Sequence, residues 1–240
     1  MKISVHTDMR MIKKIGETFG EIAFPVTCAC CGSSTSGNNR YICHWCTYKR
    51  FERAEIDLGE IKPENVSFVY AMWHFDKGGY LQDLLHNLKY NFLRGVGEEL
   101  GKILAQRFLE SANQELKELI ELNNPIIIPV PLHKSKKRQR GYNQARALAL
   151  GISMITNWEV VGEGLIIRRK KTQTQTGLNT SQRNKNLKDA FLVEDQNVIA
   201  GRFSVIVDDV FTTGATTFEL ANTIDSGSEA KTGILTVAKA

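Results

Sequence analysis

The most informative segment of the chain reads Val205-Ile206-Val207-Asp208-Asp209-Val210-Phe211-Thr212-Thr213-Gly214-Ala215-Thr216-Thr217. Its β-branched beginning predicts a buried strand that ends in two adjacent carboxylates. A small, polar loop follows, and a helical pattern of apolar residues comes after it. A strand, a tight loop and a helix N-terminus form an anion site, because free backbone N–H groups and the helix dipole point at one spot. Two aspartates would repel a bound phosphate unless the ligand also presents hydroxyls or Mg²⁺, and a phosphorylated ribose offers both.

This order of residue types resembles the fingerprint by which type I phosphoribosyltransferases bind 5-phosphoribosyl-1-pyrophosphate (PRPP). The resemblance implies that Asp208 and Asp209 bind the ribose hydroxyls. It also implies a 5′-phosphate site on the following loop, at Thr212, Thr213, Gly214, Ala215 and Thr216. The alternative interpretation is a parallel strand followed by a capped helix, in which Asp and Thr serve only as turn residues.

Two other nucleotide-binding motifs fail on spacing. The chain contains no G-x-x-x-x-G-K-[ST], which excludes a P-loop. Gly95-Val96-Gly97 begins a dinucleotide-binding pattern, but Leu100 stands where the third glycine belongs. That pattern also falls inside a helical segment and not at the end of a strand.

Length and composition indicate a globular protein. A chain of 240 residues is long enough for one sizeable domain and a small one. Its content of 42% hydrophobic and 24% charged residues is ordinary for a soluble protein. No apolar run approaches the length of a membrane span, and the N-terminus lacks the apolar core of a signal peptide. We therefore expect a cytoplasmic protein.

The net charge of +5 is unevenly distributed. Residues 133–188 contain thirteen Lys and Arg residues but only two acids, Glu159 and Glu163, so this segment carries about +11 while the rest of the chain is net acidic. Such asymmetry favours a polyanionic partner, either a pyrophosphate group or a nucleic acid. The alternative is a solvated basic face. The candidate ligand-binding residues are Lys134, Lys136, Lys137, Arg138, Arg140, Arg168, Arg169, Lys170, Lys171 and Arg183.

All five cysteines lie in the first fifth of the chain. Cys28 and Cys31 form one C-x₂-C pair, and Cys43 and Cys46 form another, which predicts a structural Zn²⁺ site with four thiolate ligands. Cys30 is interpreted as a bystander thiol. The alternatives are His44 as a ligand and a disulfide framework, but nothing in the sequence suggests export. Ahead of these pairs, an amphipathic helix is expected to dock on the zinc site or the larger domain; its apolar positions are Ile12, Ile15, Phe19 and Ile22.

The rest of the chain alternates strand-like and helical patterns. Strand patterns occur at residues 66–73, 126–131, 198–207 and 234–237, and helical patterns at residues 80–88, 100–109 and after 145. This alternation predicts an α/β domain with a mainly parallel sheet over residues 66–240, preceded by a zinc-ribbon-like head over residues 1–55. Ligands bind at the carboxyl ends of such strands. Asp208-Asp209 and Pro131-Leu132-His133 both follow strands, so they can face one cleft.

Further motifs resemble the ComF/GntX family. They are the four-cysteine head, Lys89-Tyr90, Pro129-Val130-Pro131-Leu132, Arg140-Gly141-Tyr142-Asn143-Gln144-Ala145, the Asp-Asp loop, and Thr172-x₂-Gln175-x₂-Leu178 followed by Arg183 and Asn186. The resemblance covers most of the chain. It implies a phosphoribosyltransferase-like protein that, in competent bacteria, is tied to handling incoming single-stranded DNA with the DNA-uptake proteins during natural transformation. Thr212 stands where purine-salvage relatives carry an aspartate, which argues against purine salvage and leaves the acceptor base unknown.

Three functions are compatible with these patterns. As a transferase, the chain would bind PRPP with Mg²⁺, and pyrophosphate would leave C1 of the ribose as a nitrogen nucleophile arrives. The polar residues 172–186 would then close over the site as a flap. As a non-catalytic adaptor, the basic segment would follow single-stranded DNA, with Tyr142 available to stack a base. The third function is a zinc-stabilised interaction scaffold.

Overall fold

The computed structural model describes residues 27–35, 41–54, 62–90, 94–170, 189–225 and 231–240. The chain divides into two compact units, Met1–Arg50 and Phe51–Ala240. The amphipathic stretch expected at residues 12–22 and the flap expected at residues 172–186 lie outside the described residues, as do Lys171 and Arg183.

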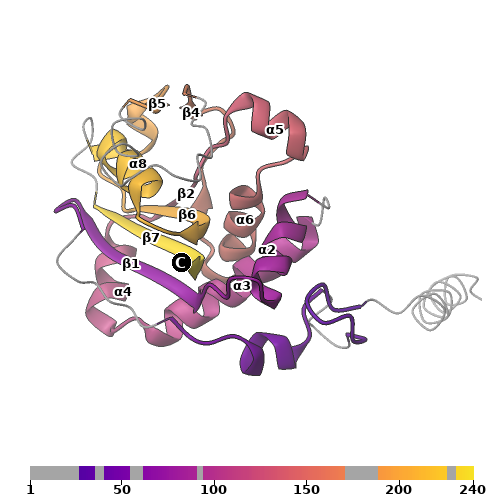
Figure 1. Cartoon of the computed structure of the whole chain (residues 1–240). Coiled ribbons are helices and arrows are strands. Elements are labelled where there is room, and N and C mark those ends of the chain that lie inside the picture. Colours follow the sequence, from indigo (N-terminus) through magenta and orange to yellow (C-terminus); the bar gives the residue numbers. More distant parts are fainter. Residues whose placement is uncertain (1–26, 36–40, 55–61, 91–93, 171–188, 226–230) are drawn as a thin grey trace, which may run out of the picture. The chain divides into compact units, whose positions relative to one another are not determined.

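The second unit is built on a five-stranded parallel sheet (Figure 1). Its strands follow the order β1 (Val66–His74), β7 (Thr232–Lys239), β6 (Ser204–Phe211), β2 (Ile126–Pro129) and β3 (Glu159–Val160). The central strands are buried along nearly their whole length, as expected of a parallel sheet that is covered on both faces. This arrangement confirms the predicted α/β class with a mainly parallel sheet.

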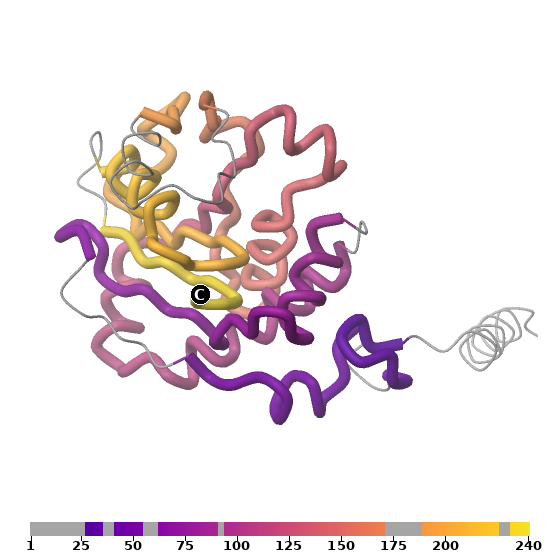
Figure 2. The backbone as a smooth tube through the Cα atoms, in the orientation of Figure 1, coloured from indigo at the N-terminus to yellow at the C-terminus, as the bar shows by residue number. Residues whose placement is uncertain are grey.

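Helices cover the two faces of the sheet (Figures 1 and 2). One face carries α3 (Arg94–Ser111) and α6 (Gln144–Thr156), with α2 (Tyr80–Tyr90) beside them, and the other carries α8 (Ala215–Asp225). Next to α8 lies the antiparallel pair β4 (Ile166–Arg168) and β5 (Phe191–Val193). The chain also forms α4 (Gln114–Leu122), which Asn113 caps by accepting from Leu116 N at 2.8 Å, and the sequence did not predict this helix.

Two local features differ from what the sequence predicted. The strand expected at residues 198–207 begins only at Ser204, because Asp195 caps the short helix η2 (Gln196–Val198) and Gly201 adopts a φ of 69° that turns the chain. The basic segment after Pro131, for which the sequence predicted no helix, forms α5 (Lys134–Arg140). His133 begins this helix as its N-cap, and Gly141 ends it in the left-handed conformation with a φ of 74°.

Glycines allow α3 and α6 to pack with their backbones in close contact. A Cβ atom on Gly151 would lie 2.0 Å from the carbonyl oxygen of Glu98, and one on Gly101 would lie 2.1 Å from that of Leu148. A Cβ on Gly97 would similarly lie 2.6 Å from the Cβ of Ala147. Gly97 is therefore a packing residue, in agreement with the rejection of a dinucleotide-binding motif in this segment.

We predict that Gly151→Ala lowers the free energy of unfolding by at least about 2 kcal/mol, because the helix backbones must separate to admit the methyl group. Gly162→Ala is the matched control, since its Cβ would meet nothing within 4 Å. Urea unfolding of both variants measures the difference. A Gly151→Ala protein as stable as the control would contradict the close packing of α3 and α6.

Candidate functional site

The central pair of strands creates a topological switch point. β2 and β6 are hydrogen-bonded neighbours, and Val130 N donates to Val207 O at 2.9 Å. The chain leaves β2 toward β3 on one side of this pair and leaves β6 toward β7 on the other. Connections that diverge in this way open a crevice at the carboxyl ends of the strands, where α/β proteins bind ligands. Asp208 and Asp209 do not end their strand, contrary to the prediction from the sequence, because β6 continues to Phe211 alongside β7. Its neighbour β2 ends at Pro129, opposite Val207, so the two aspartates lie at the edge of the crevice.

The two aspartates occupy different environments. Asp209 is 6% exposed and forms an ion pair with the ammonium of Lys89, which comes from the last turn of α2. Asp208 is half-buried, and one of its carboxylate oxygens accepts from Asp209 N at 2.9 Å. Burial and the neighbouring Asp209 charge raise the pKa of Asp208 well above its ordinary value. Burial acts the same way on Asp209, but Lys89 outweighs it and lowers the pKa of that carboxyl.

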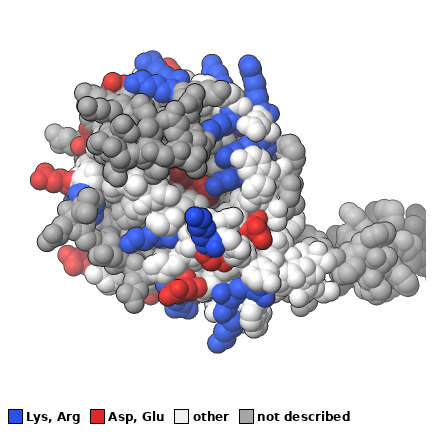
Figure 3. Space-filling view, in the orientation of Figure 1, with Lys and Arg blue, Asp and Glu red and all other residues white. Residues whose placement is uncertain are grey.

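Further cations surround this pair. Burial and the positive charge of Arg168 lower the pKa of Lys136. Arg140 and Lys89 act in the same direction on Lys136, whereas Asp208 opposes them. Burial also lowers the pKa of Arg168, again against Asp208. These mutual effects show that cations from α2, α5 and β4 converge on the carboxylates, and Figure 3 shows Lys and Arg side chains gathered over the region of α5.

Sequence reasoning proposed three of these cations, Lys136, Arg140 and Arg168, as ligand-binding residues, and the structure brings them together with the aspartates. Lys89, which pairs with Asp209, was not proposed as a site residue, and the only indication of it in the sequence was the Lys89-Tyr90 motif. Three other proposed residues are exposed: Lys134, Arg138 and Arg169. Lys170 is also exposed.

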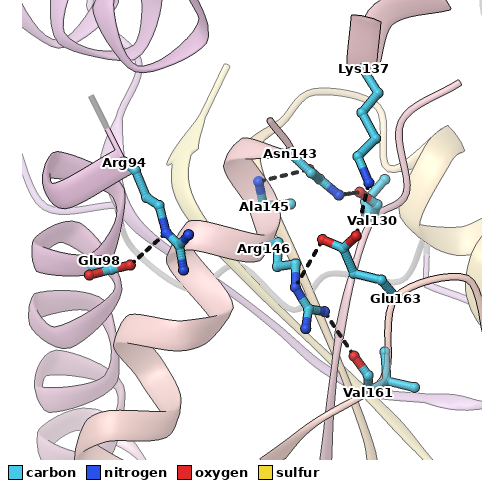
Figure 4. A network of polar contacts seen from close by, with 9 residues as sticks. All are labelled: Arg94, Glu98, Val130, Lys137, Asn143, Ala145, Arg146, Val161 and Glu163. Atoms are coloured by element: carbon cyan, nitrogen blue, oxygen red, sulfur yellow. Dashed lines mark hydrogen bonds and ion pairs between the residues drawn. The ribbon is translucent and has the colours of Figure 1, made fainter. Parts of the chain in front are cut away.

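The remaining proposed cation, Lys137, belongs to a network centred on Glu163 (Figure 4). Glu163 lies between β3 and β4, and it accepts from Lys137 Nζ at 2.9 Å and pairs with Arg146 Nε at 3.3 Å. Arg146 also donates to Val161 O at 2.9 Å. The hydrogen bond from Lys137 is the main reason that the pKa of Glu163 is lowered. The network therefore connects α5 to α6 and to the end of β3.

Tyr142 and Asn143, which follow α5, connect neighbouring elements through side-chain hydrogen bonds. The hydroxyl of Tyr142 donates to Leu88 O, beside Lys89 on α2. Asn143 caps α6 by accepting from Ala145 N at 3.1 Å, and its amide donates to Val130 O at 3.0 Å (Figure 4). Burial raises the pKa of Tyr142 to about 12, and this ring is half-buried. Tyr142 thus holds α2 against the segment between α5 and α6.

The expected phosphate loop lies at the N-terminus of α8. Thr212 and Thr213 are exposed, and Ala215 and Thr216 form the first turn of the helix. Gly214 is buried with a φ of 73°, and a Cβ there would lie 2.3 Å from the ring of Phe218. The need for glycine at this position therefore arises from the backbone conformation and from the close approach of Phe218.

The cysteine head of the first unit forms a compact ligand cluster. The Sγ atoms of Cys28, Cys31, Cys43 and Cys46 all lie within 4.8 Å of one another. A tetrahedral zinc ion with Zn–S bonds of about 2.3 Å requires sulfur separations of about 3.8 Å, and Cys31 Sγ lies 3.7 Å from Cys43 Sγ. Gly32, with a φ of 74°, supplies the turn after the first pair, and η1 (Cys46–Arg50) follows the second.

The surroundings of the four sulfurs also suit a metal ion. Cys43 N donates to Cys28 Sγ at 3.2 Å, and Cys46 N donates to Cys43 Sγ at 3.5 Å, which favours thiolates. Burial raises the pKa of Cys30 to about 11, and this thiol stays outside the cluster. All five cysteines are free, so the disulfide alternative is wrong. The four clustered cysteines could hold a metal ion, and their chemistry is that of a structural zinc site.

Comparisons with known proteins find relatives of about half of the chain. No protein-family model matches the chain. Competence protein F of Haemophilus influenzae is 39% identical over 119 residues, which cover 48% of this chain and 51% of the relative. DNA utilization protein YhgH of Escherichia coli K12 is 33% identical over 141 residues, or 59% of each chain. YhgH of Salmonella typhimurium is 32% identical over 140 residues, or 58% of each.

The chain spans about half the length of the curated relatives it matches. These relatives support the assignment of the chain to the ComF family. None of the described helices combines the length and the apolar content needed to cross a membrane.

We predict opposite effects of two substitutions on stability. The folded-state pKa of Asp208 is raised, so its ionisation opposes folding as pH rises through that value, and Asp208→Asn should raise the melting temperature at neutral pH. The pKa of Asp209 is lowered, so this residue contributes stability above its unfolded pKa that is lost as pH falls. Asp209→Asn should cost about 3 kcal/mol at neutral pH, because Lys89 loses its partner.

Thermal unfolding at several pH values measures both effects, and the difference between the two variants should shrink toward acidic pH. Two variants with equal melting temperatures at neutral pH would contradict the electrostatic difference between the two carboxyls.

We also predict one Zn²⁺ per chain in the cysteine head. Four thiolates leave no open position for water, so the ion is structural, and it supplies on the order of 10 kcal/mol of folding free energy. Chelation should unfold the first unit and leave the second largely folded, as measured by circular dichroism with elemental analysis. Reduced, freshly purified protein without stoichiometric zinc would count against this site.

Proposed function

We propose that the second unit binds PRPP together with Mg²⁺ at the carboxyl ends of β2 and β6. The observation that carries the proposal is the pair Asp208-Asp209 at a topological switch point, with cations converging on it from α2, α5 and β4. A ligand that presents both hydroxyls and a polyphosphate would bind the carboxylates through the hydroxyls and the cations through the polyphosphate. PRPP has this composition, because its ribose carries hydroxyls, a 5′-phosphate and a pyrophosphate at C1.

Each element of the site then has a role. Asp208 and Asp209 accept hydrogen bonds from the ribose hydroxyls, and Lys89 keeps Asp209 ionised for this purpose. The exposed loop before α8 and the N-terminus of that helix hold the 5′-phosphate. The pyrophosphate lies against Lys136 and Arg168, because both cations are partly buried and the charge of Arg168 disfavours the protonated form of Lys136, so that an anion beside them would be favourable.

The same arrangement supports phosphoribosyl transfer. The bond between C1 and the pyrophosphate oxygen breaks with its electron pair on the leaving group, and the lone pair of an acceptor nitrogen forms the new bond to C1. The acceptor nitrogen then loses its proton to water. Bound Mg²⁺ would neutralise part of the pyrophosphate charge. Lys136, Arg140 and Arg168 would stabilise the charge that develops on the leaving oxygen.

The relatives indicate the biological setting of this proposal. They are named for competence and for DNA utilization. Because the similarity covers only about half of each relative, a role of this chain in the use of incoming DNA is likewise part of the proposal.

We predict that Asp208→Asn and Asp209→Asn each weaken Mg²⁺–PRPP binding by roughly 1–3 kcal/mol, the scale of a charge-assisted hydrogen bond. Isothermal titration calorimetry measures the effect. Lys136→Gln should also weaken binding, whereas Lys102→Gln, an exposed lysine of α3, is the matched control. If both aspartate variants bind PRPP like the parent, the proposed ligand is wrong.

A non-catalytic adaptor for single-stranded DNA is the second candidate. It is favoured by the exposed cations Lys134, Arg138 and Arg169, which the proposed PRPP site does not use. A pyrophosphate-release assay with a panel of bases separates the candidates. PRPP binding without release, combined with oligonucleotide binding that Lys134→Gln and Arg138→Gln weaken, would favour the adaptor.

A further inference from the structure

The last turn of α2 carries Lys89, the partner of Asp209. The helix packs through buried leucines on one face, and these are Leu81, Leu84, Leu85 and Leu88. Lys89 comes after the last of them, is partly exposed, and stands one residue before the helix ends at Tyr90. Helix ends fray, because their last carbonyls have no partner within the helix. The position of the Lys89 ammonium therefore depends on contacts between this turn and other elements.

One carbonyl of this turn has a partner from a distant segment. Leu88 O accepts from the hydroxyl of Tyr142, which lies 54 residues further along the chain. Leu88 C=O belongs to the same planar peptide group as the N–H of Lys89, so a bond to this oxygen orients the backbone that leads into Lys89. Burial raises the pKa of Tyr142 to about 12, so the hydroxyl keeps its proton and remains a donor at neutral pH.

A second contact joins the same two segments. The guanidinium of Arg140, the last residue of α5, lies 5.4 Å from the centre of the Tyr90 ring. Tyr90 is 42% exposed, and a cation–π contact is weak where water reaches it. The hydrogen bond from the half-buried Tyr142 is therefore the stronger of these two contacts.

We propose that Tyr142 is a positioning residue of the binding site, because its hydroxyl orients the last turn of α2 and so keeps the Lys89 ammonium on Asp209. The inference rests on the proposed binding of PRPP. It gives Tyr142 a part in ribose recognition that is exerted through Lys89 and not by contact with the ligand. Without Lys89, the buried carboxyl of Asp209 would take up a proton, and a neutral carboxyl accepts hydrogen bonds less strongly than a carboxylate.

The charges around Asp209 explain why the placement of Lys89 matters. Burial raises the pKa of this carboxyl, and the charge of Lys89 is the largest influence that lowers it. The hydrogen bond with Asp208 and the charge of Arg140 also lower the pKa, but by less. Tyr142 is neutral, so its replacement by phenylalanine changes no charge beside Asp209. Any rise in the pKa of Asp209 in that variant would therefore report movement of Lys89.

Calorimetric titration of Tyr142→Phe with PRPP, ribose 5-phosphate and pyrophosphate, each with Mg²⁺, tests the inference. We expect the affinities for PRPP and ribose 5-phosphate to fall roughly tenfold, the scale of one lost hydrogen bond. Pyrophosphate should bind as it does to the parent. Tyr90→Ala is the matched control, since it removes the ring contact of the same turn and keeps the hydroxyl of Tyr142. Its affinities should stay close to those of the parent.

The pH dependence separates positioning from a general loss of structure. Carbon NMR of labelled aspartate side chains reports the pKa of Asp209 in the ligand-free chain, and Asp209→Asn identifies its signal. We expect a higher pKa for Asp209 in Tyr142→Phe than in the parent. The difference in affinity for ribose 5-phosphate between the two proteins should then grow as pH falls. A variant that is merely less stable would keep the parental pKa in its folded molecules.

A double variant tests whether Tyr142 acts through Lys89. Adding Tyr142→Phe to Lys89→Gln should then cause no further loss of affinity for ribose 5-phosphate. Additive losses would overturn the inference, and so would a Tyr142→Phe protein with parental affinities and a parental pKa of Asp209. A parent that binds neither PRPP nor ribose 5-phosphate would contradict the proposed function instead. The pKa of Asp209 in the ligand-free chain would still decide whether Tyr142 positions Lys89.

Discussion

The arrangement of the second unit depends on the buried ion pair between Lys89 and Asp209. A buried carboxylate without a partner costs several kcal/mol, so Asp209 can lie within the central strand β6 because an ammonium neutralises it. Lys89 in turn is held in place next to Leu88, whose carbonyl oxygen accepts from the hydroxyl of Tyr142. Since Tyr142 lies between α5 and α6, one hydrogen bond connects the position of the ion pair to that of the basic helix.

The basic helix α5 is stabilised by its capping residues and by an ion pair, and not by burial of apolar side chains. None of the side chains of α5 is buried. It is capped by His133 and Gly141 and pinned through Lys137 to Glu163, an ion pair between two largely exposed groups. Contacts of this kind contribute about 1 kcal/mol or less, so α5 belongs to the least stable part of the unit. Such a helix can adjust its cations to a ligand without disturbing the sheet.

The sequence predicted features that follow from local patterns. The β-branched run before Asp208 predicted a buried parallel strand, and the two C-x₂-C pairs predicted a cluster of four cysteines. Both predictions were possible because each pattern is contained in a few neighbouring residues. The sequence did not predict that residues 134–140 are helical, since seven polar residues have no apolar periodicity, and the caps at His133 and Gly141 decide the outcome. The role of Lys89 could not be predicted from the sequence either. A lysine at the end of an amphipathic helix is usually solvated, and only the fold brings it to Asp209.

Calorimetric titration of the intact chain with PRPP, ribose 5-phosphate and pyrophosphate, each with Mg²⁺, tests the central claim most directly. The account assigns the ribose to Asp208 and Asp209 and the pyrophosphate to Lys136 and Arg168, so each fragment occupies only part of the site. PRPP should therefore bind more tightly than either fragment, because one molecule satisfies both groups without a second loss of translational freedom. Pyrophosphate that binds as tightly as PRPP would contradict the account, since the aspartates would then contribute nothing to recognition.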